Sequence, residues 1–318
     1  MKHNIVVFDA SQVAELALQV DVLSSLRRMF LSLGNNQAVQ PPQLRNAFPG
    51  DQGNFISYLG TLSEERVFGA KLSPYINRPT GPLVTAWTLM MSMDDGQPRM
   101  LCDSAQLTVE RTAGTTALAV DLLAPKRAAK LVVIGAGRLG QAHVRHVLAL
   151  RDWQEIRLYS RNIGAMSDAD QQALRSIDPR VSIYSELASA VDDADVVMLC
   201  TSAGKTVLDP AILTKPALIT SICTNAPFAH EVPPESLLHM DVYCDYRATT
   251  PASAGEMRLA SEQHGWSVDS ILGDLPELLM GTAVKSDLNC HTFFRSIGLG
   301  LEDIAVANEL YQLHLKSH

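Results

Sequence analysis

The sequence predicts an α/β protein in which a doubly wound parallel sheet is inserted into a discontinuous first domain of helices and antiparallel strands. Three observations support this. From Lys130 onward, short apolar strands alternate with helical segments, which is typical of a parallel sheet covered by helices. Residues 37–101 instead contain apolar runs separated by Pro, Gly, Asn and Asp, which favours antiparallel pairing. A last amphipathic pattern over 298–315 predicts a terminal helix that returns to the first domain.

Composition sets the size of the protein and limits its partners. A chain of 318 residues suits two domains, and we expect the first in residues 1–112 and 292–318 and the second in residues 113–291. The net charge of −8 argues against nucleic acid or an anionic membrane as the main partner. No apolar run is long enough to span a membrane. The five widely spaced cysteines favour reduced thiols in the cytoplasm over a disulfide framework.

The first domain should contain two long helices and an antiparallel sheet. Apolar residues recur at helical spacing over 12–33, where Ser11 is a suitable N-cap and Gly34 ends the pattern. A second helix is predicted from Ser104 to about Leu123, because Pro125 breaks the pattern. Asp94-Asp95-Gly96 signals a hairpin turn, and the predicted strands are Phe55–Leu59, Val67–Leu72 and Val84–Met91.

The second domain repeats strand and helix. Its first strand, Leu131–Ile134, is wholly apolar, as expected for a strand that is buried on both faces. A glycine turn and a helix over about 138–150 follow it. Further strands are predicted at Ile156–Tyr159, Val181–Tyr184, Val196–Cys200, Ala217–Ile222 and Val242–Cys244. Helical segments separate most of these strands, so we expect a parallel sheet of the Rossmann type.

The turn after the first of these strands has the GxGxxG pattern of dinucleotide-binding proteins, Gly135-Ala136-Gly137-Arg138-Leu139-Gly140. In that pattern Gly135 permits a tight turn, Gly137 lets the backbone approach a pyrophosphate, and Gly140 lets the helix approach the strand. The helix N-terminus then offers N–H groups and a positive dipole end to the phosphates. Arg138 either adds positive charge or only starts the helix. The alternative is a structural turn without a ligand, and the flanking strand and helix favour the dinucleotide.

The end of the next strand distinguishes NAD from NADP. NAD-dependent enzymes usually place an acidic residue there to bind the ribose 2′-OH, whereas this chain has Ser160-Arg161-Asn162. A hydroxyl and a guanidinium can bind a 2′-phosphate, so we predict NADP(H) in preference to NAD(H). Thr201 and Ser202 follow the strand over 196–200 at the carboxyl edge of the sheet. They are interpreted either as cofactor contacts or as a helix cap.

Several short motifs, in their order and spacing, make nearly the whole chain similar to the ornithine cyclodeaminase/mu-crystallin family. The resemblance implies that the first domain binds substrate and forms a homodimer, and that the second binds NAD(P). Members include cyclodeaminases, alanine dehydrogenases and imine reductases, so it also implies an imino-acid or amino-acid substrate. The motifs are Gly69-Ala70-Lys71-Leu72 with Asn77, Leu107–Ala113, Gly135-Ala136-Gly137, Ala194–Val197 with Thr201, Gly255-Glu256, Gly273–Leu278 with Gly281, and Arg295–Gly298.

The resemblance also assigns residues to the substrate. Arg45, Lys71 and Arg111 match positions that surround the substrate carboxylate, which must be held so that the C=N carbon meets the nicotinamide. A guanidinium can bind a carboxylate in a bidentate manner, and Lys71 can also protonate the developing amine. From the local pattern alone, Lys71 would lie on a solvated strand face, and Arg111 would form a surface ion pair with Glu110.

Other matched positions concern the cofactor. Thr112 would contact a cofactor phosphate, and Ser296 and Ile297 would lie near the nicotinamide. Outside the resemblance, His143 and His146 lie one turn apart on the helix after the glycine loop, a spacing that can bind a metal. Because no third ligand is evident, a helix surface is the preferred interpretation of these two histidines.

One position departs from the family. In cyclodeaminases an aspartate after the strand over 217–222 is the general acid/base, and aligning on Pro227 and Glu231 places Asn225 there. An asparagine cannot exchange a proton at neutral pH. Reduction of an iminium that is already protonated needs less proton transfer than deamination does. Asn225 therefore favours imine reduction over cyclodeamination, and Glu231 itself is interpreted as structural.

We therefore expect an NADPH-dependent reductase of small cyclic or open imino acids that yields L-amino acids. Δ1-Pyrroline-2-carboxylate, Δ1-piperideine-2-carboxylate and other ketimines are the candidate substrates. One alternative is an ornithine cyclodeaminase or an alanine-type L-amino-acid dehydrogenase. The other is a non-catalytic NADPH-binding protein similar to mu-crystallin. Turnover of NADPH with cyclic imines, or ammonia release from ornithine, distinguishes these possibilities.

Overall fold

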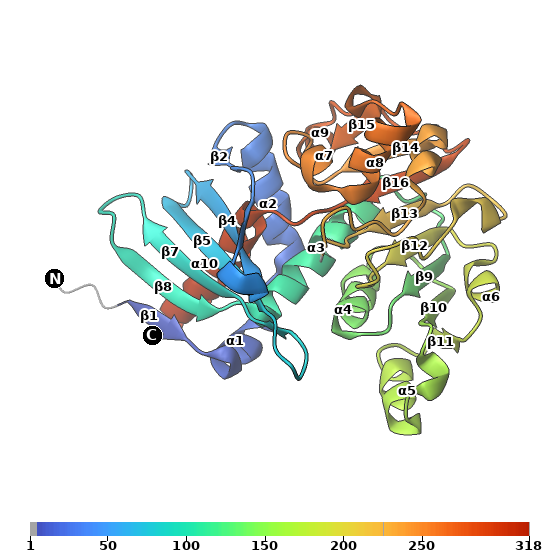
Figure 1. The fold of residues 1–318 in the computed structure, drawn as a ribbon. Helices are drawn as coiled ribbons and strands as arrows, with labels where there is room; N and C mark the ends of the chain where they lie inside the picture. The colour runs from blue at the N-terminus through green and yellow to red at the C-terminus, as the bar shows by residue number, and fades with distance from the viewer. Residues whose placement is uncertain (1–4, 225, 318) are drawn as a thin grey trace. The chain divides into compact units, whose positions relative to one another are not determined.

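The computed structural model describes residues 5–224 and 226–317 and confirms the predicted fold class (Figure 1). The chain divides into a first unit of residues 1–111 and 298–318 and a second unit of residues 112–297. The second unit extends to residue 297 and not only to the expected residue 291, which lies in strand β16 (His291–Arg295). This strand pairs with two strands of the second unit, so the chain returns to the first unit only at Gly298.

The first unit contains an eight-stranded sheet with strand order β1-β8-β7-β5-β4-β2, in which β3 pairs with β4 and β6 pairs with β5. All pairs are antiparallel except β1 with β8. Gly96 has a φ of 67° in the turn between β7 and β8, as expected from the Asp94-Asp95-Gly96 signal. The strands are β1 (Val6–Phe8), β2 (Ala38–Val39), β3 (Leu44–Ala47), β4 (Gly53–Leu62), β5 (Val67–Ile76), β6 (Leu83–Val84), β7 (Trp87–Ser92) and β8 (Pro98–Asp103).

The single helix expected over 12–33 is in fact two helices, α1 (Ala10–Ala17) and α2 (Val22–Gly34). Each helix begins at its own aspartate. The Asp9 side chain accepts from the backbone N–H of Ser11 and Gln12, and the Asp21 side chain accepts from that of Ser24. Because an N-cap starts a new helix, Asp21 divides the predicted helix in two, although the apolar spacing continues across it. Ser11 is therefore a residue of α1 and not its cap.

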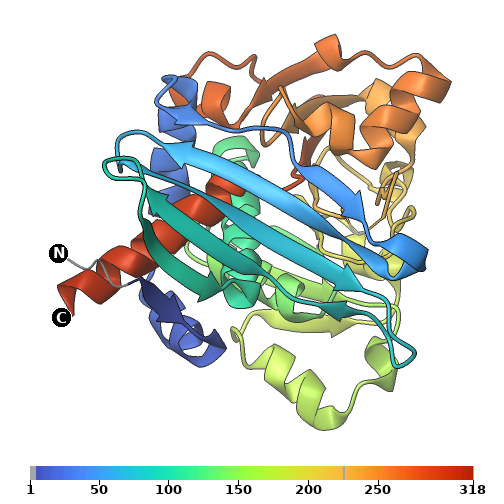
Figure 2. The same cartoon turned by 60° about the vertical axis from the view of Figure 1, so that its left-hand side comes forward.

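Helix α10 (Gly300–Lys316) packs on one face of this sheet, against β4, β5 and β7, and against α2 (Figure 2). Its first half is buried on all sides from Gly300 to Ala307, so the predicted amphipathic pattern is wrong there. A Cβ atom at Gly60 of β4 would lie 2.8 Å from the Leu301 Cα, so the glycine allows α10 to approach the strand closely. The buried first turn of α10 carries two acidic residues, Glu302 and Asp303.

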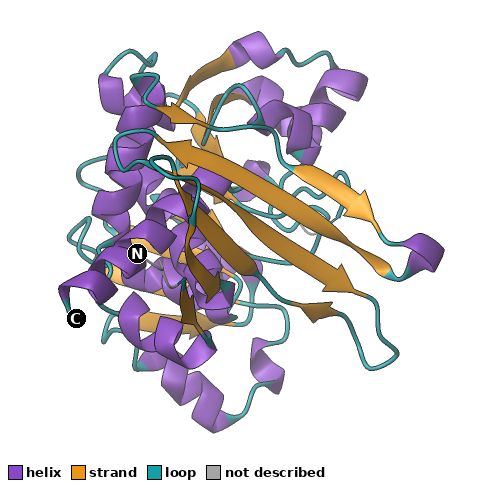
Figure 3. Cartoon of the chain, turned by 90° about the vertical axis from the view of Figure 1, so that its left-hand side faces the viewer, coloured by secondary structure: helices purple, strands orange, loops and turns teal. Residues whose placement is uncertain are grey.

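The opposite face of the same sheet carries exposed apolar side chains. Figure 3 shows the strands of this sheet toward the viewer. The strand register places eight large apolar side chains on this face, and each is at least one-third exposed. They are Val7, Val39, Leu44, Leu59, Phe68, Leu72, Trp87 and Leu89, which we call the apolar sheet face. A continuous surface of this kind usually marks an interaction site.

The second unit is an eight-stranded sheet in which every pair is parallel, with strand order β11-β10-β9-β12-β13-β16-β14-β15. The order reverses between β9 and β12, which makes this the position where an open α/β sheet binds ligands. The strands are β9 (Lys130–Ile134), β10 (Glu155–Tyr159), β11 (Val181–Tyr184), β12 (Val196–Leu199), β13 (Leu218–Ser221), β14 (Met240–Cys244), β15 (Ile271–Asp274) and β16.

The helices of the second unit connect these strands. They are α4 (Arg138–Val147), α5 (Asp168–Arg175), α6 (Leu187–Val191), α7 (Thr250–Ser253), α8 (Gly255–His264) and α9 (Leu275–Met280). The long helix α3 (Ala105–Leu123) begins in the first unit and continues in the second. Strands β15 and β16 were not predicted, because glycine and aspartate end the apolar run of β15, and histidine, threonine and arginine leave only two apolar residues in β16. In the part of the chain that the structure describes, no helix combines the length and apolarity needed to cross a bilayer.

Candidate functional site

The glycine turn between β9 and α4 has the geometry that its three glycines predict. Gly135 has a φ of 120°, and a Cβ there would lie 2.5 Å from the Cys200 carbonyl oxygen. A Cβ at Gly140 would lie 1.8 Å from the Gly135 carbonyl oxygen, so only glycine lets α4 pack this close to the turn. At Gly137, by contrast, a Cβ would meet no atom within 4 Å. Gly137 therefore leaves open space above the N-terminus of α4.

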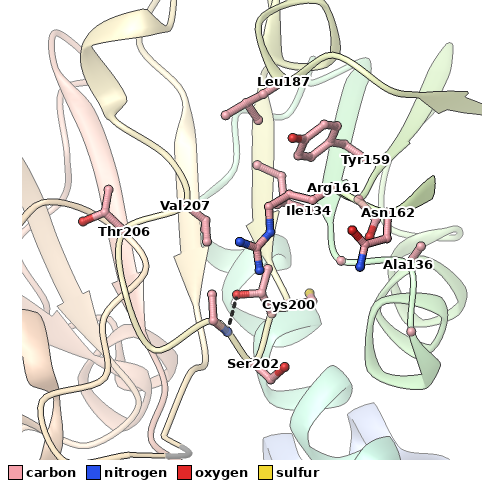
Figure 4. Close-up of a pocket in the computed structure, with 15 residues that line it drawn as sticks. Ile134, Ala136, Tyr159, Arg161, Asn162, Leu187, Cys200, Ser202, Thr206 and Val207 are labelled. Atoms are coloured by element: carbon pink, nitrogen blue, oxygen red, sulfur yellow. Dashed lines mark hydrogen bonds between the residues drawn. The ribbon is translucent and has the colours of Figure 1, made fainter. Parts of the chain in front are cut away.

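A pocket of about 500 Å³ opens beside this turn, at the carboxyl ends of β9, β10 and β12 (Figure 4). Gly137 is the N-cap of α4 and makes no side-chain cap hydrogen bond, so the first N–H groups of the helix receive no cap from it. Residues of the glycine turn, the segment after β10 and the segment after β12 line the pocket. The predicted residues among them are Gly135, Gly137, Ser160, Arg161, Asn162, Thr201 and Ser202.

Arg161 is the basic side chain of this lining. It follows β10, is exposed, and points into the pocket (Figure 4). Within the lining there is no aspartate or glutamate, so nothing there repels a phosphate. This set of residues, together with the open space at Gly137, fits a dinucleotide whose pyrophosphate would meet the N-terminus of α4.

Other predicted cofactor residues do not line this pocket. Arg138 and Leu139 form the first turn of α4. The carbonyl oxygen of Thr112 accepts from the Thr116 hydroxyl. The Ser296 hydroxyl and the Ile297 N–H donate to the buried Asp245 carboxylate at 2.9 and 2.7 Å. Their cofactor contacts therefore stay predictions, and Asn225 lies outside the described residues.

A buried glutamate holds the edge of the pocket. Glu231 is fully buried, and its Oε1 accepts from the N–H and hydroxyl of Thr201 at 2.9 and 2.7 Å. Its Oε2 accepts from the Ser221 hydroxyl and from the N–H groups of Ile222 and Cys223. Its carbonyl oxygen also accepts from the N–H of Val207, a pocket residue. Glu231 is therefore structural, as expected, and it holds two segments that line the pocket.

The histidine pair after the glycine loop is not a surface pair. His143 is fully buried, and its Nδ1 and Nε2 lie 2.7 Å from the Leu139 carbonyl oxygen and 3.2 Å from the Thr116 Oγ1. The preferred interpretation as a helix surface is therefore wrong for His143, which packs between α4 and α3. Over residues 5–224 and 226–317, no three potential ligand side chains gather in a way that could hold a metal ion.

The first unit contains a second polar cluster, built on the sheet face that α10 covers. Lys71 lies on β5 opposite Tyr58 of β4, and its Nζ is 4.3 Å from the centre of the Tyr58 ring. Lys71 and Arg111 are 1% and 4% exposed, so both local expectations, a solvated lysine and a surface arginine, are wrong. A Cβ at Gly298 would lie 2.1 Å from Arg111 Nη1, which explains the glycine at this position.

Two carboxylates from α10 accompany these cations. Asp303 lies 2.8 Å from both Lys71 Nζ and Arg111 Nε, and Glu302 lies 3.0 Å from Arg111 Nη1. Sequence analysis did not identify Glu302 or Asp303. The available signal was an adjacent acidic pair inside an otherwise apolar stretch, Gly300–Ala307, because a buried acidic residue is rare unless it is paired.

Burial and charge shift the proton affinity of this cluster. Desolvation, reinforced by Arg111, lowers the pKa of Lys71 to about 8, although Asp303 opposes the shift. Desolvation also raises the pKa of Tyr58 to about 12. A pKa of about 8 is closer to neutral pH than that of an ordinary lysine, and the role of Lys71 as a proton donor stays a prediction.

Arg45 lies on β3, whose partner residue on β4 is Ile56, two positions from Tyr58. Paired residues and residues two apart share a sheet face, so Arg45 is on the face that carries Lys71. Its positive charge acts on the Tyr58 hydroxyl. Arg45 therefore shares the sheet face of Lys71, and a role of these three cations in binding a substrate carboxylate stays a prediction.

Comparison with known proteins identifies the family of this chain. The ornithine cyclodeaminase/mu-crystallin family model matches residues 4–317. The chain belongs to this family. It is 55% identical over 303 residues to the NAD(P)H-dependent anabolic L-arginine dehydrogenase DauB of Pseudomonas aeruginosa, covering 95% of each chain. It is 25% identical over 230 residues to a Δ1-pyrroline-2-carboxylate reductase of Colwellia psychrerythraea, covering 70% of this chain and 72% of the relative.

Solved structures show the same fold at low sequence identity. A Thermococcus litoralis Δ1-pyrroline-2-carboxylate reductase, solved with NADH and L-proline, is 19% identical and superimposes with a TM-score of 0.88 over 98% of both chains. An archaeal alanine dehydrogenase dimer with bound NAD is 20% identical, with a TM-score of 0.88 over 98% of this chain and 97% of that one. Together with the relatives, the family match makes this protein an NAD(P)H-dependent oxidoreductase of amino or imino acids.

Proposed function

We propose that this protein interconverts an L-amino acid and its 2-oxo acid plus ammonia through the α-imino acid, with L-arginine as the first candidate substrate. The observation that carries this proposal is the 55% identity, over 95% of both chains, to an anabolic L-arginine dehydrogenase. In the anabolic direction, ammonia condenses with the 2-oxo acid and releases water. The imine is then reduced at its carbon.

The buried cluster of the first unit suits the amino-acid end of this substrate. The guanidinium of Arg111 and the ammonium of Lys71 attract the carboxylate, and Arg45 on the same sheet face adds a third positive charge. When bound, the reduced nicotinamide supplies a hydride to the C=N carbon. The nitrogen then takes one proton, which we assign to Lys71, and Lys71 recovers it from solvent.

The pocket of the second unit supports NADP(H) as the preferred cofactor. Arg161 and Ser160 line it, and no acidic residue of the lining competes with a 2′-phosphate. Open space at Gly137 leaves room for the pyrophosphate beside α4. The free state of all five cysteines supports a cytoplasmic location, where thiols stay reduced.

Cyclic imines are the second candidate substrates. Several relatives that match at 21–25% identity are Δ1-pyrroline-2-carboxylate reductases, and Asn225 favours imine reduction over deamination with ring closure. A cyclic imine presents the same carboxylate and C=N bond to Lys71 and Arg111. It needs no ammonia, which separates it experimentally from a 2-oxo acid.

We further propose that the protein is a homodimer and that a second copy covers the apolar sheet face. Eight large apolar side chains on one face are more than an isolated monomer usually exposes together. The structural neighbour with alanine dehydrogenase activity is described as a dimer, which supports a second copy as the occupant.

The test is a screen of NADPH oxidation, with NADH in parallel. The 2-oxo acid of arginine with ammonium, Δ1-pyrroline-2-carboxylate and Δ1-piperideine-2-carboxylate are the substrates, and L-arginine with NADP⁺ tests the reverse direction. We expect fastest turnover with the arginine pair and NADPH. Absence of turnover with every substrate, together with intact NADPH binding, would overturn the proposal in favour of a cofactor-binding protein.

A further inference from the structure

One carboxylate of the first unit contacts two basic side chains at once. Asp303 lies 2.8 Å from Lys71 Nζ and 2.8 Å from Arg111 Nε, and all three residues are at most 4% exposed. Lys71 also donates to the Thr108 hydroxyl at 3.3 Å. Because Asp303 lies in the first turn of α10, and the first half of this helix is buried on all sides, its own position is fixed by packing.

The groups around Lys71 come from every element packed against it. Within the sheet, Lys71 pairs with Tyr58 on β4 and with Thr88 on β7, and Thr88 pairs in turn with Cys102 on β8. The helices contribute Thr108 and Arg111 from α3, and Glu302 and Asp303 from α10. Asp303 is the carboxylate that directly contacts Lys71 in this set. Without it, Lys71 and Arg111 would be two like charges in a desolvated site, and they would repel each other.

We propose that Asp303 is a positioning residue for the reaction: it holds Lys71 over Tyr58 and beside Arg111, so that one substrate carboxylate can meet both cations and the imine nitrogen can meet the Lys71 ammonium. This inference rests on the proposed function of Lys71. A lysine has four rotatable side-chain bonds and adopts many rotamers, so a fixed partner is needed to keep its ammonium within hydrogen-bonding distance of one atom.

The same contact determines the pH at which Lys71 is charged. Burial and Arg111 lower the pKa of Lys71, and Asp303 is the largest influence that raises it. An uncharged residue at position 303 should therefore lower the pKa of Lys71 below about 8. Lys71 donates a proton only when it is charged. As the pH rises, the variant should therefore lose activity at a lower pH than the wild type does.

The experiment compares the wild type with Asp303→Asn, Asp303→Glu and the matched control Glu309→Gln, which removes a charge from the solvent-facing part of α10. For each variant, kcat/KM for the imino acid is measured from pH 6 to pH 10. NADPH affinity, measured by fluorescence, checks that the second unit is intact, and thermal denaturation checks that the first unit, which contains Asp303, is folded.

For Asp303→Asn we expect kcat/KM to fall by about 10-fold or more and its alkaline limb to move to lower pH by about one unit, with unchanged NADPH affinity. Asp303→Glu keeps the charge, so its alkaline limb should stay near that of the wild type while kcat falls. It also provides the test if Asp303→Asn does not fold. The inference would be overturned if Asp303→Asn kept the alkaline limb of the wild type and a kcat/KM within twofold of the wild-type value. Full activity of Lys71→Met would instead overturn the proposed function of Lys71.

Discussion

At the scale of single residues, long-range partners decide which charged side chains can be functional. Lys71 and Arg111 are buried because α10, about 200 residues further along the chain, brings Glu302 and Asp303 to them. The local sequence around Lys71 contains no sign of these partners. The pattern alone therefore predicted a solvated lysine, and only the family resemblance pointed to the substrate.

Arg161 allows a prediction about cofactor choice. Its guanidinium lines the pocket without an acidic neighbour in the lining, so its charge should act mainly on a 2′-phosphate. Loss of a charge-assisted hydrogen bond costs about 1.5–3 kcal/mol. We expect Arg161→Ala to raise KM for NADPH by about 10- to 100-fold and to leave KM for NADH nearly unchanged. Steady-state kinetics with both cofactors measures this difference.

The control for Arg161→Ala is Arg175→Ala, which removes an exposed arginine from the last turn of α5 in the same unit. It should change neither KM. An equal rise of KM for NADPH and NADH in Arg161→Ala would contradict the assignment of Arg161 to the 2′-phosphate, because both cofactors share every other group.

At the scale of elements, the sequence patterns were most informative where local chemistry is strict. Strand β9, the glycine turn and α4 match the prediction closely, because Gly135 and Gly140 occupy positions where any side chain would collide with backbone. Strands β15 and β16 were missed, since polar residues and a glycine leave only two consecutive apolar residues in each. The break between α1 and α2 was missed because the apolar spacing continues across Asp21.

Glu231 connects elements that the sequence separates. Its carboxylate accepts hydrogen bonds from the ends of β12 and β13, and its backbone holds the pocket residue Val207. In glutamine, an NH₂ group would replace one carboxylate oxygen of Glu231, and it would point at N–H groups that now donate to that oxygen. We expect Glu231→Gln to raise KM for NADPH by about 10-fold, from the loss of about 1–3 kcal/mol, with a smaller change in KM for the imino acid.

Binding titrations with NADPH test this prediction, and Glu186→Gln is the matched control. Glu186 precedes α6 in the same unit, is exposed and makes no side-chain cap hydrogen bond, so its substitution should be neutral. If Glu231→Gln bound NADPH like the wild type at the same thermal stability, Glu231 would not position the pocket.

At the scale of the whole molecule, two units divide the chemistry. The first holds the buried cluster of Lys71, Arg111, Glu302 and Asp303, and the second holds the dinucleotide pocket. Alternation of strands and helices predicted the parallel sheet, and turn residues predicted the antiparallel one. The boundary at Gly298 was not predictable from these patterns, because β16 is short and follows a long irregular segment.

The apolar sheet face leads to a prediction about assembly. Leu89 lies on β7 within this face and is 37% exposed. A charge placed there would be buried without a partner in the dimer, so Leu89→Asp should weaken association by about 100-fold or more. Sedimentation equilibrium measures this change. Leu18→Asp, at a position that is 88% exposed after α1, should leave the dimer intact.

A single measurement tests the central claim that a hydride from the cofactor reaches the imino-acid carbon. NADPH deuterated at C4 of the nicotinamide, prepared separately on each face, is incubated with the protein, ammonium and the 2-oxo acid of arginine, and with Δ1-pyrroline-2-carboxylate in parallel. The product is analysed by chiral chromatography and mass spectrometry. We predict one deuterium at Cα of an L-amino acid, from one face of the nicotinamide only. An amino acid without deuterium from either label, or no amino acid at all with protein that binds NADPH, would contradict the account.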